Sequence, residues 1–184
     1  MIRVAAEEDW PAILAVHRAA FGEEDVPRIA EELHESEWYV PELSFVAEEE
    51  GRVVGHVMNT WGSVKGSAAP VLQLAPLGVL PEFQGRDHGS ALVRASLEAV
   101  RARGEPLLLV EGNPAYYGRF GFVRADELGL LPPPEVLHDW AFQVAVLDRP
   151  STCRRAASAT RRRSDTGEPA ERRPPRRPPR VPGL

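Results

Sequence analysis

The spacing of hydrophobic residues divides the first 62 positions into a helical part and an extended part. Apolar side chains recur at helical spacing over residues 7–22 and again over 25–36, which predicts two helices, the second of them strongly acidic. Over residues 43–62 the period becomes two, as in half-buried strands, and Glu50-Gly51 interrupts it at the centre. The pattern therefore predicts two helices followed by a β-hairpin.

The later part of the pattern alternates strands with helices. Residues 71–80 and 106–111 are rich in apolar side chains, which indicates buried strands, and residues 88–103 between them have the clearest helical period in the chain. In the first of these strands Pro76 and Gly78 favour a bulge or an opened ladder, because proline cannot donate to a neighbouring strand. Strand, helix and strand in this order form one right-handed crossover.

The order of the elements indicates the fold class. Residues 113–122 predict a turn with a short helix, and residues 140–147 predict one more strand. Helices, a hairpin and then alternating strands and helices make a mixed α/β protein, with helices packed on a twisted, mixed sheet. In such sheets ligands bind outside the carboxyl ends of the parallel strands. Residues 84–90 lie at that end.

Composition separates the end of the chain from the rest. Residues 151–184 hold ten arginines against three acidic residues, with no aromatic residue and only two large aliphatic ones. Such a segment buries too little apolar surface to offset the entropy of ordering. We therefore expect one folded domain over residues 1–150 and a disordered or polyproline-like tail over 151–184.

Bulk features exclude several classes of protein. The chain has 184 residues, 43% of them hydrophobic, and no apolar run approaches the roughly 20 residues of a membrane span. Cys153 is the one cysteine, which excludes disulfides within the chain and cysteine-based zinc sites, and the five histidines show no paired metal-ligand spacing. Because the first residues lack the pattern of a signal peptide, we expect a soluble protein of the cytoplasm.

The segment QGRDHGS at residues 84–90 has the composition of a phosphate-binding loop. Gly85 and Gly89 let the backbone come close to a ligand, and the helix that follows has free N–H groups and a positive dipole end at its start. A pyrophosphate is the ligand that this arrangement favours. A glycine turn that only reverses the chain has the same pattern, so the loop alone leaves both alternatives open.

Three segments in order carry a resemblance to the GCN5-related N-acetyltransferase family, and especially to its small bacterial members. They are LAPLGVLPEF at 74–83, QGRDHG at 84–89 and NPAYYGRFGF at 113–122. Gln84 and Gly89 match the first and last positions of the family's pyrophosphate loop, and the third segment contains the Tyr-x-x-x-Gly-Phe end of the family's next helix. The resemblance covers most of the chain before the basic tail.

The resemblance implies acetyl-CoA as co-substrate and direct transfer of its acetyl group to a primary amine, without a metal. The pantetheine would bind, strand-like, to the backbone of Leu77, Gly78 and Val79, where a free amide at Gly78 would polarise the thioester carbonyl. Asn113 would contact the pantetheine. Tyr117 matches the family's general acid for the departing thiolate, with aromatic packing as the alternative role. The pyrophosphate would lie on Gln84, Gly85, Arg86, Asp87, His88, Gly89 and Ser90.

Two departures from the family pattern bear on activity. Asp87 stands where the family loop has its first glycine; its charge would repel a pyrophosphate, and as a helix cap it would occupy amides that the phosphate needs. Asp tolerates a left-handed backbone, however, and Arg86 and His88 would restore positive potential. The family's last strand, which inserts beside the strand matching 106–111, is missing in this prediction, because an arginine- and proline-rich tract occupies its place.

The sequence therefore predicts an acetyl-CoA-dependent N-acetyltransferase, with a CoA-binding or inactive regulatory module as the alternative. Binding of nucleic acid or of an acidic partner by the tail is a third hypothesis. We disfavour specific binding, because arginines without interleaved aromatic residues neutralise phosphate but do not stack bases. The general base stays open: Glu111 ends a central strand, and the histidines lack context. The acceptor, a small-molecule or a peptide amine, and the oligomeric state, monomer or homodimer, stay open as well.

Overall fold

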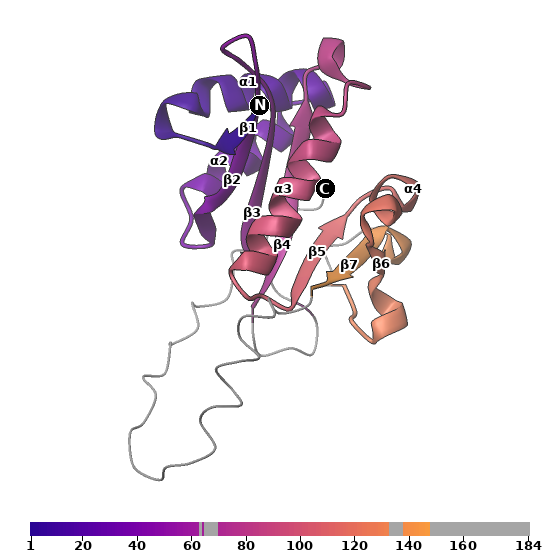
Figure 1. Ribbon diagram of the computed structural model, residues 1–184. Coiled ribbons are helices and arrows are strands. Elements are labelled where there is room, and N and C mark those ends of the chain that lie inside the picture. The colour runs from indigo at the N-terminus through magenta and orange to yellow at the C-terminus, as the bar shows by residue number, and fades with distance from the viewer. Residues whose placement is uncertain (63, 65–69, 133–137, 148–184) are drawn as a thin grey trace, which may run out of the picture.

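A seven-stranded mixed sheet organises the part of the chain that the computed structural model describes, residues 1–62, 64, 70–132 and 138–147 (Figure 1). The strands are β1 (Ile2–Val4), β2 (Tyr39–Glu49), β3 (Arg52–Gly62), β4 (Val71–Val79), β5 (Leu107–Glu111), β6 (Val123–Arg124) and β7 (Phe142–Val146). The helices are α1 (Trp10–Phe21), α2 (Asp25–His34), α3 (His88–Ala102) and α4 (Pro114–Tyr117). The spatial order is β1-β2-β3-β4-β5-β7-β6; β4 and β5 are parallel, and the other neighbours are antiparallel. The predicted mixed α/β class is confirmed.

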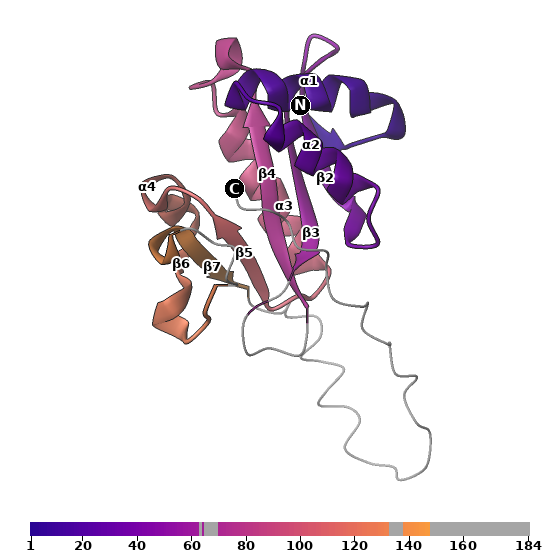
Figure 2. The same cartoon turned by 180° about the vertical axis from the view of Figure 1, so that it is seen from behind.

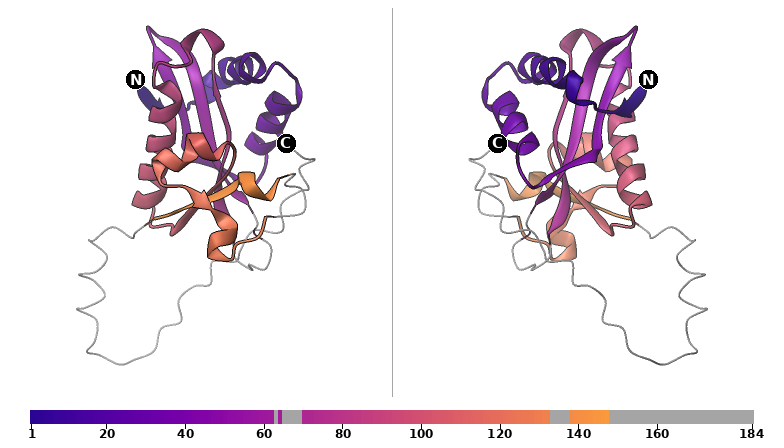
Figure 3. Two further views of the ribbon diagram at one scale, coloured as in Figure 1. Left: turned by 90° about the vertical axis from the view of Figure 1, so that its right-hand side faces the viewer. Right: turned by 90° about the vertical axis from the view of Figure 1, so that its left-hand side faces the viewer.

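Amphipathic helices cover both faces of this sheet. α3 packs on one face through side chains that include Leu92, Val93 and Val100, and α1 and α2 lie on the other face (Figures 2 and 3). α4 follows β5, and its residue Tyr117 belongs to the same apolar cluster as the inner side of α3. Within the described ranges, no helix is long and apolar enough to cross a bilayer.

The hairpin of β2 and β3 turns at the two predicted residues. Glu50 and Gly51 both have a positive φ, 51° and 76°, as required by the tight turns whose twist suits an antiparallel pair. β2 begins at Tyr39, earlier than predicted. Pro41 and a shift in register between Tyr39 and Ser44 break the alternation there, so the sequence pattern did not reveal this part of the strand.

The ladder between β3 and β4 contains the predicted bulge. Asn59 pairs with Leu74 and Val57 pairs with Leu77, so β4 carries one extra residue between these pairs, at Ala75-Pro76. The extra residue shifts the alternation of side chains by one position. Even-numbered residues before the bulge therefore face the same side of the sheet as odd-numbered residues after it.

β4 and β5 separate beyond the bulge, as an opened ladder requires. Their parallel pairing joins Leu72–Leu74 to Leu108–Val110, and no further pair between them follows in the described residues. Figure 1 shows the two strands side by side at their first residues and apart at their carboxyl ends. One backbone edge of β4, over residues 75–79, therefore faces this gap instead of a neighbouring strand.

The strand that we expected to be missing is present, so that prediction was wrong. Residues 142–146 form β7, which pairs directly with β5, and β7 also pairs with the two-residue strand β6. The strand predicted at 140–147 is therefore itself the inserted strand. The sequence analysis missed β6 instead, because two exposed residues at a sheet edge have no period to detect. The expected domain boundary at residue 150 and the basic tail lie outside the described residues.

Candidate functional site

The start of α3 has the backbone of an anion site. Gly85 and Asp87 both adopt the left-handed conformation, with φ of 74° and 67°, and α3 begins immediately afterwards at His88. No side chain caps this helix end. The N–H groups of its first turn have no acceptor within the helix and lie at the positive end of its dipole. The loop therefore presents free backbone donors to solvent.

Asp87 does not occupy these donors. Its tolerance of a left-handed backbone is confirmed, but the expected capping hydrogen bond is absent, and its carboxylate instead accepts from Arg94 Nη1 at 3.1 Å. Hydrogen bonding from Ser90 and Arg94, together with the positive charge of Arg94, lowers the pKa of the Asp87 carboxyl. The left-handed backbone directs this side chain along the outside of α3, away from the capping position.

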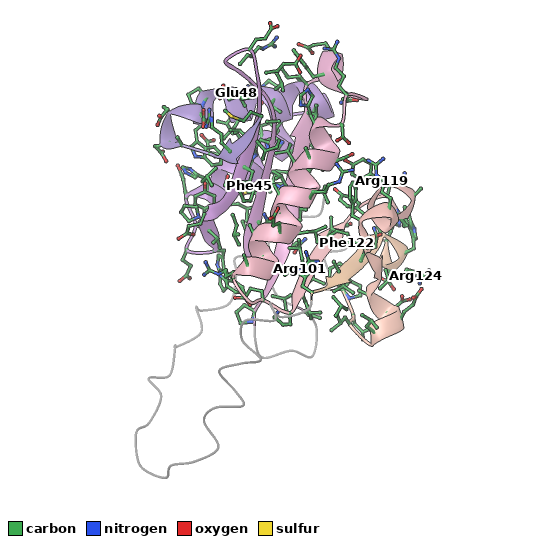
Figure 4. All side chains as sticks on the ribbon, in the orientation of Figure 1. Phe45, Glu48, Arg101, Arg119, Phe122 and Arg124 are labelled. Carbon is green, nitrogen blue, oxygen red and sulfur yellow. The ribbon has the colours of Figure 1, made fainter. Side chains whose placement is uncertain are left out.

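The cations nearest to this loop differ from those expected. His88 Nε2 lies 2.7 Å from Glu49 Oε2, and Arg86 lies 3.8 Å from the same carboxylate, so both are partnered on the hairpin. Arg119 lies on the turn after α4 (Figure 4). It donates to Ser90 Oγ at 3.0 Å. Its guanidinium also lies over the Tyr116 ring, 4.3 Å from the centroid. Arg119 was detectable only through its place in the matched segment YYGRFGF.

Two further residues fix the position of the loop. Gln84 Nε2 donates to the carbonyl oxygen of Val79 at 3.0 Å, which ties the loop to the end of β4. Gly89 lies against Tyr116: a Cβ at this position would come within 2.8 Å of the Tyr116 hydroxyl oxygen. Gly89 is therefore needed where α4 meets the first turn of α3.

The open edge of β4 presents backbone groups without a partner strand next to the loop. Leu80 donates its N–H to Val54 of β3 at 2.9 Å. Because neighbouring residues of a strand direct their backbone groups to opposite edges, Leu77 and Val79 face the gap to β5, whereas Gly78 faces β3. The free amide expected at Gly78 thus belongs to its two neighbours instead.

Gly78 has a different role in the packing. A Cβ at this residue would lie 2.8 Å from Nδ1 of His17, a side chain of α1. His17 Nε2 in turn lies 2.8 Å from His56 Nδ1, and His56 Nε2 lies 3.0 Å from Ser44 Oγ. The side chains of His17, His56 and Ser44 are all fully buried. This contact was not predictable from the sequence, because the two histidines lie on different elements, far apart in the chain.

Burial keeps both histidines uncharged. It lowers the pKa of His17 to about 4. Burial also lowers the pKa of His56 well below its ordinary value, and the neighbouring His17 and His34 act in the same direction. His17 Nδ1 has no hydrogen-bond partner among the described residues. The pair therefore holds α1 against β3 and β4 as neutral rings.

Tyr117 and Asn113 lie at the other side of the gap, where β5 ends. The Tyr117 ring is buried against Gly112, where any side chain would overlap it, and its centroid lies 5.6 Å from that of Phe122. Burial, and to a smaller extent Tyr116, raise the pKa of the Tyr117 phenol, so it stays protonated at neutral pH. Asn113 caps α4, since its Oδ1 accepts from the N–H of Ala115 at 2.9 Å.

A pocket of about 420 Å³ opens between the separated strands. Leu72 and Leu74 of β4 face the core under α3, so Gln73 and Ala75, which line the pocket, face the opposite side of the sheet. The other lining residues are Glu111, Gly112, Asn113, Trp140 and Ala141. The loop at α3 and this pocket therefore approach the gap between β4 and β5 from the two faces of the sheet.

Comparison with known proteins was made on sequence and on fold. A family model described as an acetyltransferase (GNAT) domain matches residues 1–125. The chain is similar to two Escherichia coli K12 proteins, both named as uncharacterized N-acetyltransferases. YjhQ is 36% identical over 121 residues, which cover 65% of this chain and 67% of that one, and YhbS is 31% identical over 126 residues, 68% and 74%.

Solved structures show the same similarity. The crystal structure of Escherichia coli YhbS in complex with CoA has a TM-score of 0.70 and 28% identity, and the match covers 80% of this chain and 81% of that one. A GNAT family acetyltransferase from Brucella melitensis in complex with acetyl-CoA has a TM-score of 0.67 and 28% identity, with 80% and 88% covered.

Proposed function

The chain belongs to the GNAT family of acetyltransferases, and from this premise we propose that it transfers the acetyl group of acetyl-CoA to a primary amine. One observation carries the proposal: uncapped helix donors at residues 85–90 lie next to the unpaired edge of β4. The first group suits a pyrophosphate, and the second suits an amide-rich pantetheine. The CoA and acetyl-CoA complexes of the two similar structures support this pairing. We propose the cytoplasm as its compartment.

The cofactor is held mainly by backbone groups. The pyrophosphate accepts from the N–H groups between Gly85 and Ser90, and Arg119 supplies a positive charge beside Ser90. Gln84 positions this loop through its bond to Val79. The pantetheine pairs with the edge of β4 at Leu77 and Val79, which brings the thioester into the gap between β4 and β5.

The transfer follows from this placement. An uncharged amine attacks the acetyl carbonyl carbon, a C–N bond forms and the C–S bond breaks. The amides that face the gap donate to the carbonyl oxygen while it carries negative charge. The neutral phenol of Tyr117 gives its proton to the leaving sulfur. Asn113 borders the pantetheine at the end of β5.

A second function, a CoA-binding module without turnover, is favoured by one observation. Asp87 carries a charged carboxylate beside the loop, paired with Arg94, which competes with a bound pyrophosphate for positive charge. The other reason for this alternative, the missing strand, is removed by the presence of β7 beside β5.

Release of the CoA thiol, followed with a thiol reagent over a panel of amines, tests the proposal. Tyr117→Phe should lower kcat by about 10²–10⁴-fold, because it removes the proton donor, while the Kd for CoA stays within about threefold. Tyr39→Phe, the same change on β2 outside the site, serves as the control and should retain activity. Equal losses in binding and turnover for Tyr117→Phe would assign this ring to packing. Binding of CoA without release of thiol for any amine would favour the module without turnover.

A further inference from the structure

The pocket between β4 and β5 has the size and walls of a small-molecule site. Its volume of about 420 Å³ is near the lower end of the roughly 300–1,000 Å³ that ligand pockets occupy. Its lining combines small residues, such as Ala75 and Gly112, with one large aromatic side chain, Trp140. This volume is too small for a folded segment of another protein, and it lies on the sheet face opposite to α3.

Among the lining residues that the structure describes, Glu111 supplies the only formal charge. It is half-buried at the last position of β5, and burial raises the pKa of its carboxyl, an effect that His138 opposes. No hydrogen bond or ion pair to its carboxylate is formed within the described part of the chain. A partly desolvated carboxylate without a partner is stabilised by a cation that enters the pocket.

Trp140 gives the pocket a flat apolar wall. The side chain is half exposed, although an indole usually buries most of its surface. One of its faces stacks on His138, with ring centroids 5.5 Å apart and an angle of 17° between the planes. The stacked indole borders the pocket, where a flat ligand or an alkylammonium group gains from contact with the π-face.

We propose that this pocket is the acceptor site, and that it selects a small monocationic amine with a flat apolar body, bound between Glu111 and Trp140. The inference rests on the proposed acetyl transfer and adds the class of its acceptor. Glu111 attracts the ammonium and orients the nitrogen toward the gap where the thioester lies. The apolar body lies against the indole.

Glu111 also completes the proton balance of the reaction. When the amine nitrogen bonds to the acetyl carbon, that nitrogen becomes positively charged and acidic. It loses that proton to the Glu111 carboxylate, which before the attack has taken the first proton of the bound ammonium and passed it to solvent. The C–S bond breaks, the sulfur takes a proton from Tyr117, and the phenolate recovers one from solvent. The acetylated product is a neutral amide, which no longer pairs with the carboxylate and therefore leaves the pocket.

Other amine classes fit this pocket less well. A polyamine carries further charges, for which the described lining residues offer no second carboxylate. A peptide amine carries more backbone polar groups than the amides of Gln73 and Asn113 can pair in a mostly apolar lining, at a cost in binding. The lining residues thus discriminate among amines that all carry a reactive primary amine group.

Acetyl transfer to a matched panel tests the proposal: phenethylamine and tryptamine as flat monocations, spermidine as a polyamine and an N-terminal alanine tripeptide. With saturating acetyl-CoA, we expect the two flat amines to exceed the other two by about tenfold or more in kcat/KM. Faster transfer to spermidine or to the tripeptide would overturn the assigned class and leave the acetyltransferase function intact. Absence of transfer to all four, with CoA bound, would overturn both.

Variants of the two lining residues test the roles separately. Glu111→Gln should lower kcat/KM for phenethylamine by about 10²-fold or more without changing the Kd for CoA, because it removes both the charge and the proton acceptor. Glu98→Gln, on the exposed face of α3, is the matched control and should leave kcat/KM unchanged.

Trp140→Ala should raise KM for phenethylamine by about 5- to 20-fold with kcat nearly retained, and Trp140→Phe should restore most of the loss. An unchanged kcat/KM in Glu111→Gln, or equal losses for all four amines in Trp140→Ala, would overturn the proposal.

Discussion

Acid should destabilise this protein through His17 well before its carboxylates are protonated. The ring is fully buried, and burial lowers its pKa from 6.5 to about 4. A depressed pKa means that the folded state favours the neutral ring. Above pH 6.5 the ring is neutral in the unfolded chain as well, so His17 does not reduce the free energy of unfolding there. As the pH falls from 6.5 toward 4, the unfolded chain takes up a proton that the folded protein excludes, and the free energy of unfolding decreases.

The size of the effect follows from the shift. The full difference in pKa corresponds to about 3 kcal/mol, of which about 2 kcal/mol is lost between pH 7.5 and pH 5. His17→Gln removes this proton uptake, and its amide keeps a donor within reach of His56. His56 remains buried in both proteins, and because His17 also lowers its pKa, the difference between the two proteins reports on His17 together with its effect on His56.

Urea unfolding of both proteins at pH 7.5, 6 and 5 measures the effect. We expect the wild type to lose about 2 kcal/mol more than His17→Gln between the two extremes. The difference should persist in 0.5 M salt, because desolvation and not surface charge causes it. If the two proteins lose stability in parallel, to within about 0.5 kcal/mol, the buried neutral histidine pair is not the origin of acid sensitivity, and the account of Gly78 as space for His17 loses its support.

Two changes in the loop test the cofactor site. Asp87→Gly should tighten CoA binding about fivefold at low salt and less at high salt, because it removes a negative charge beside the pyrophosphate, and glycine suits the left-handed backbone at this residue. Calorimetric titration at two salt concentrations measures the affinity. An unchanged or weaker affinity would show that the Asp87 carboxylate does not repel the bound pyrophosphate. Gly89→Ala should weaken CoA binding by about tenfold or more, since its Cβ would lie 2.8 Å from the Tyr116 hydroxyl oxygen and displace α4 or the loop. The second change Tyr116→Phe, which removes that oxygen, should restore part of the affinity, whereas a tolerated Gly89→Ala would contradict the close packing of α3 against α4.

The elements that the sequence revealed are those with a strong period or a strong local signal. α3 combines a continuous apolar stripe with glycine beside each end, and the β2–β3 hairpin has Glu50-Gly51 at its turn. The bulge in β4 was predictable because Pro76 cannot donate to a ladder. β6 has only two residues, so its presence depends on pairing with β7, which no local pattern records.

The candidate site likewise has parts that the sequence predicted and parts that it did not. The loop at 84–90 was predictable, since its glycines and the following helix lie in one continuous segment. The direction of the Asp87 carboxylate was not, because it depends on a left-handed backbone that carries the side chain toward Arg94. The contact of His17 with His56 and the placement of Trp140 beside Glu111 join residues from different elements. These side chains meet only because α1 packs on the sheet and β7 pairs with β5 within it.

Backbone amide NMR of the protein titrated with CoA tests the central claim most directly. If the pyrophosphate lies on the start of α3 and the pantetheine on the edge of β4, the largest shifts should fall on the amides of Gly85 to Ser90 and of Leu77 and Val79. Amides on the outer faces of α1 and α2 should change little. Saturable binding with the largest shifts elsewhere, or no shifts at millimolar CoA, would contradict the proposed cofactor site and the acetyl transfer built on it.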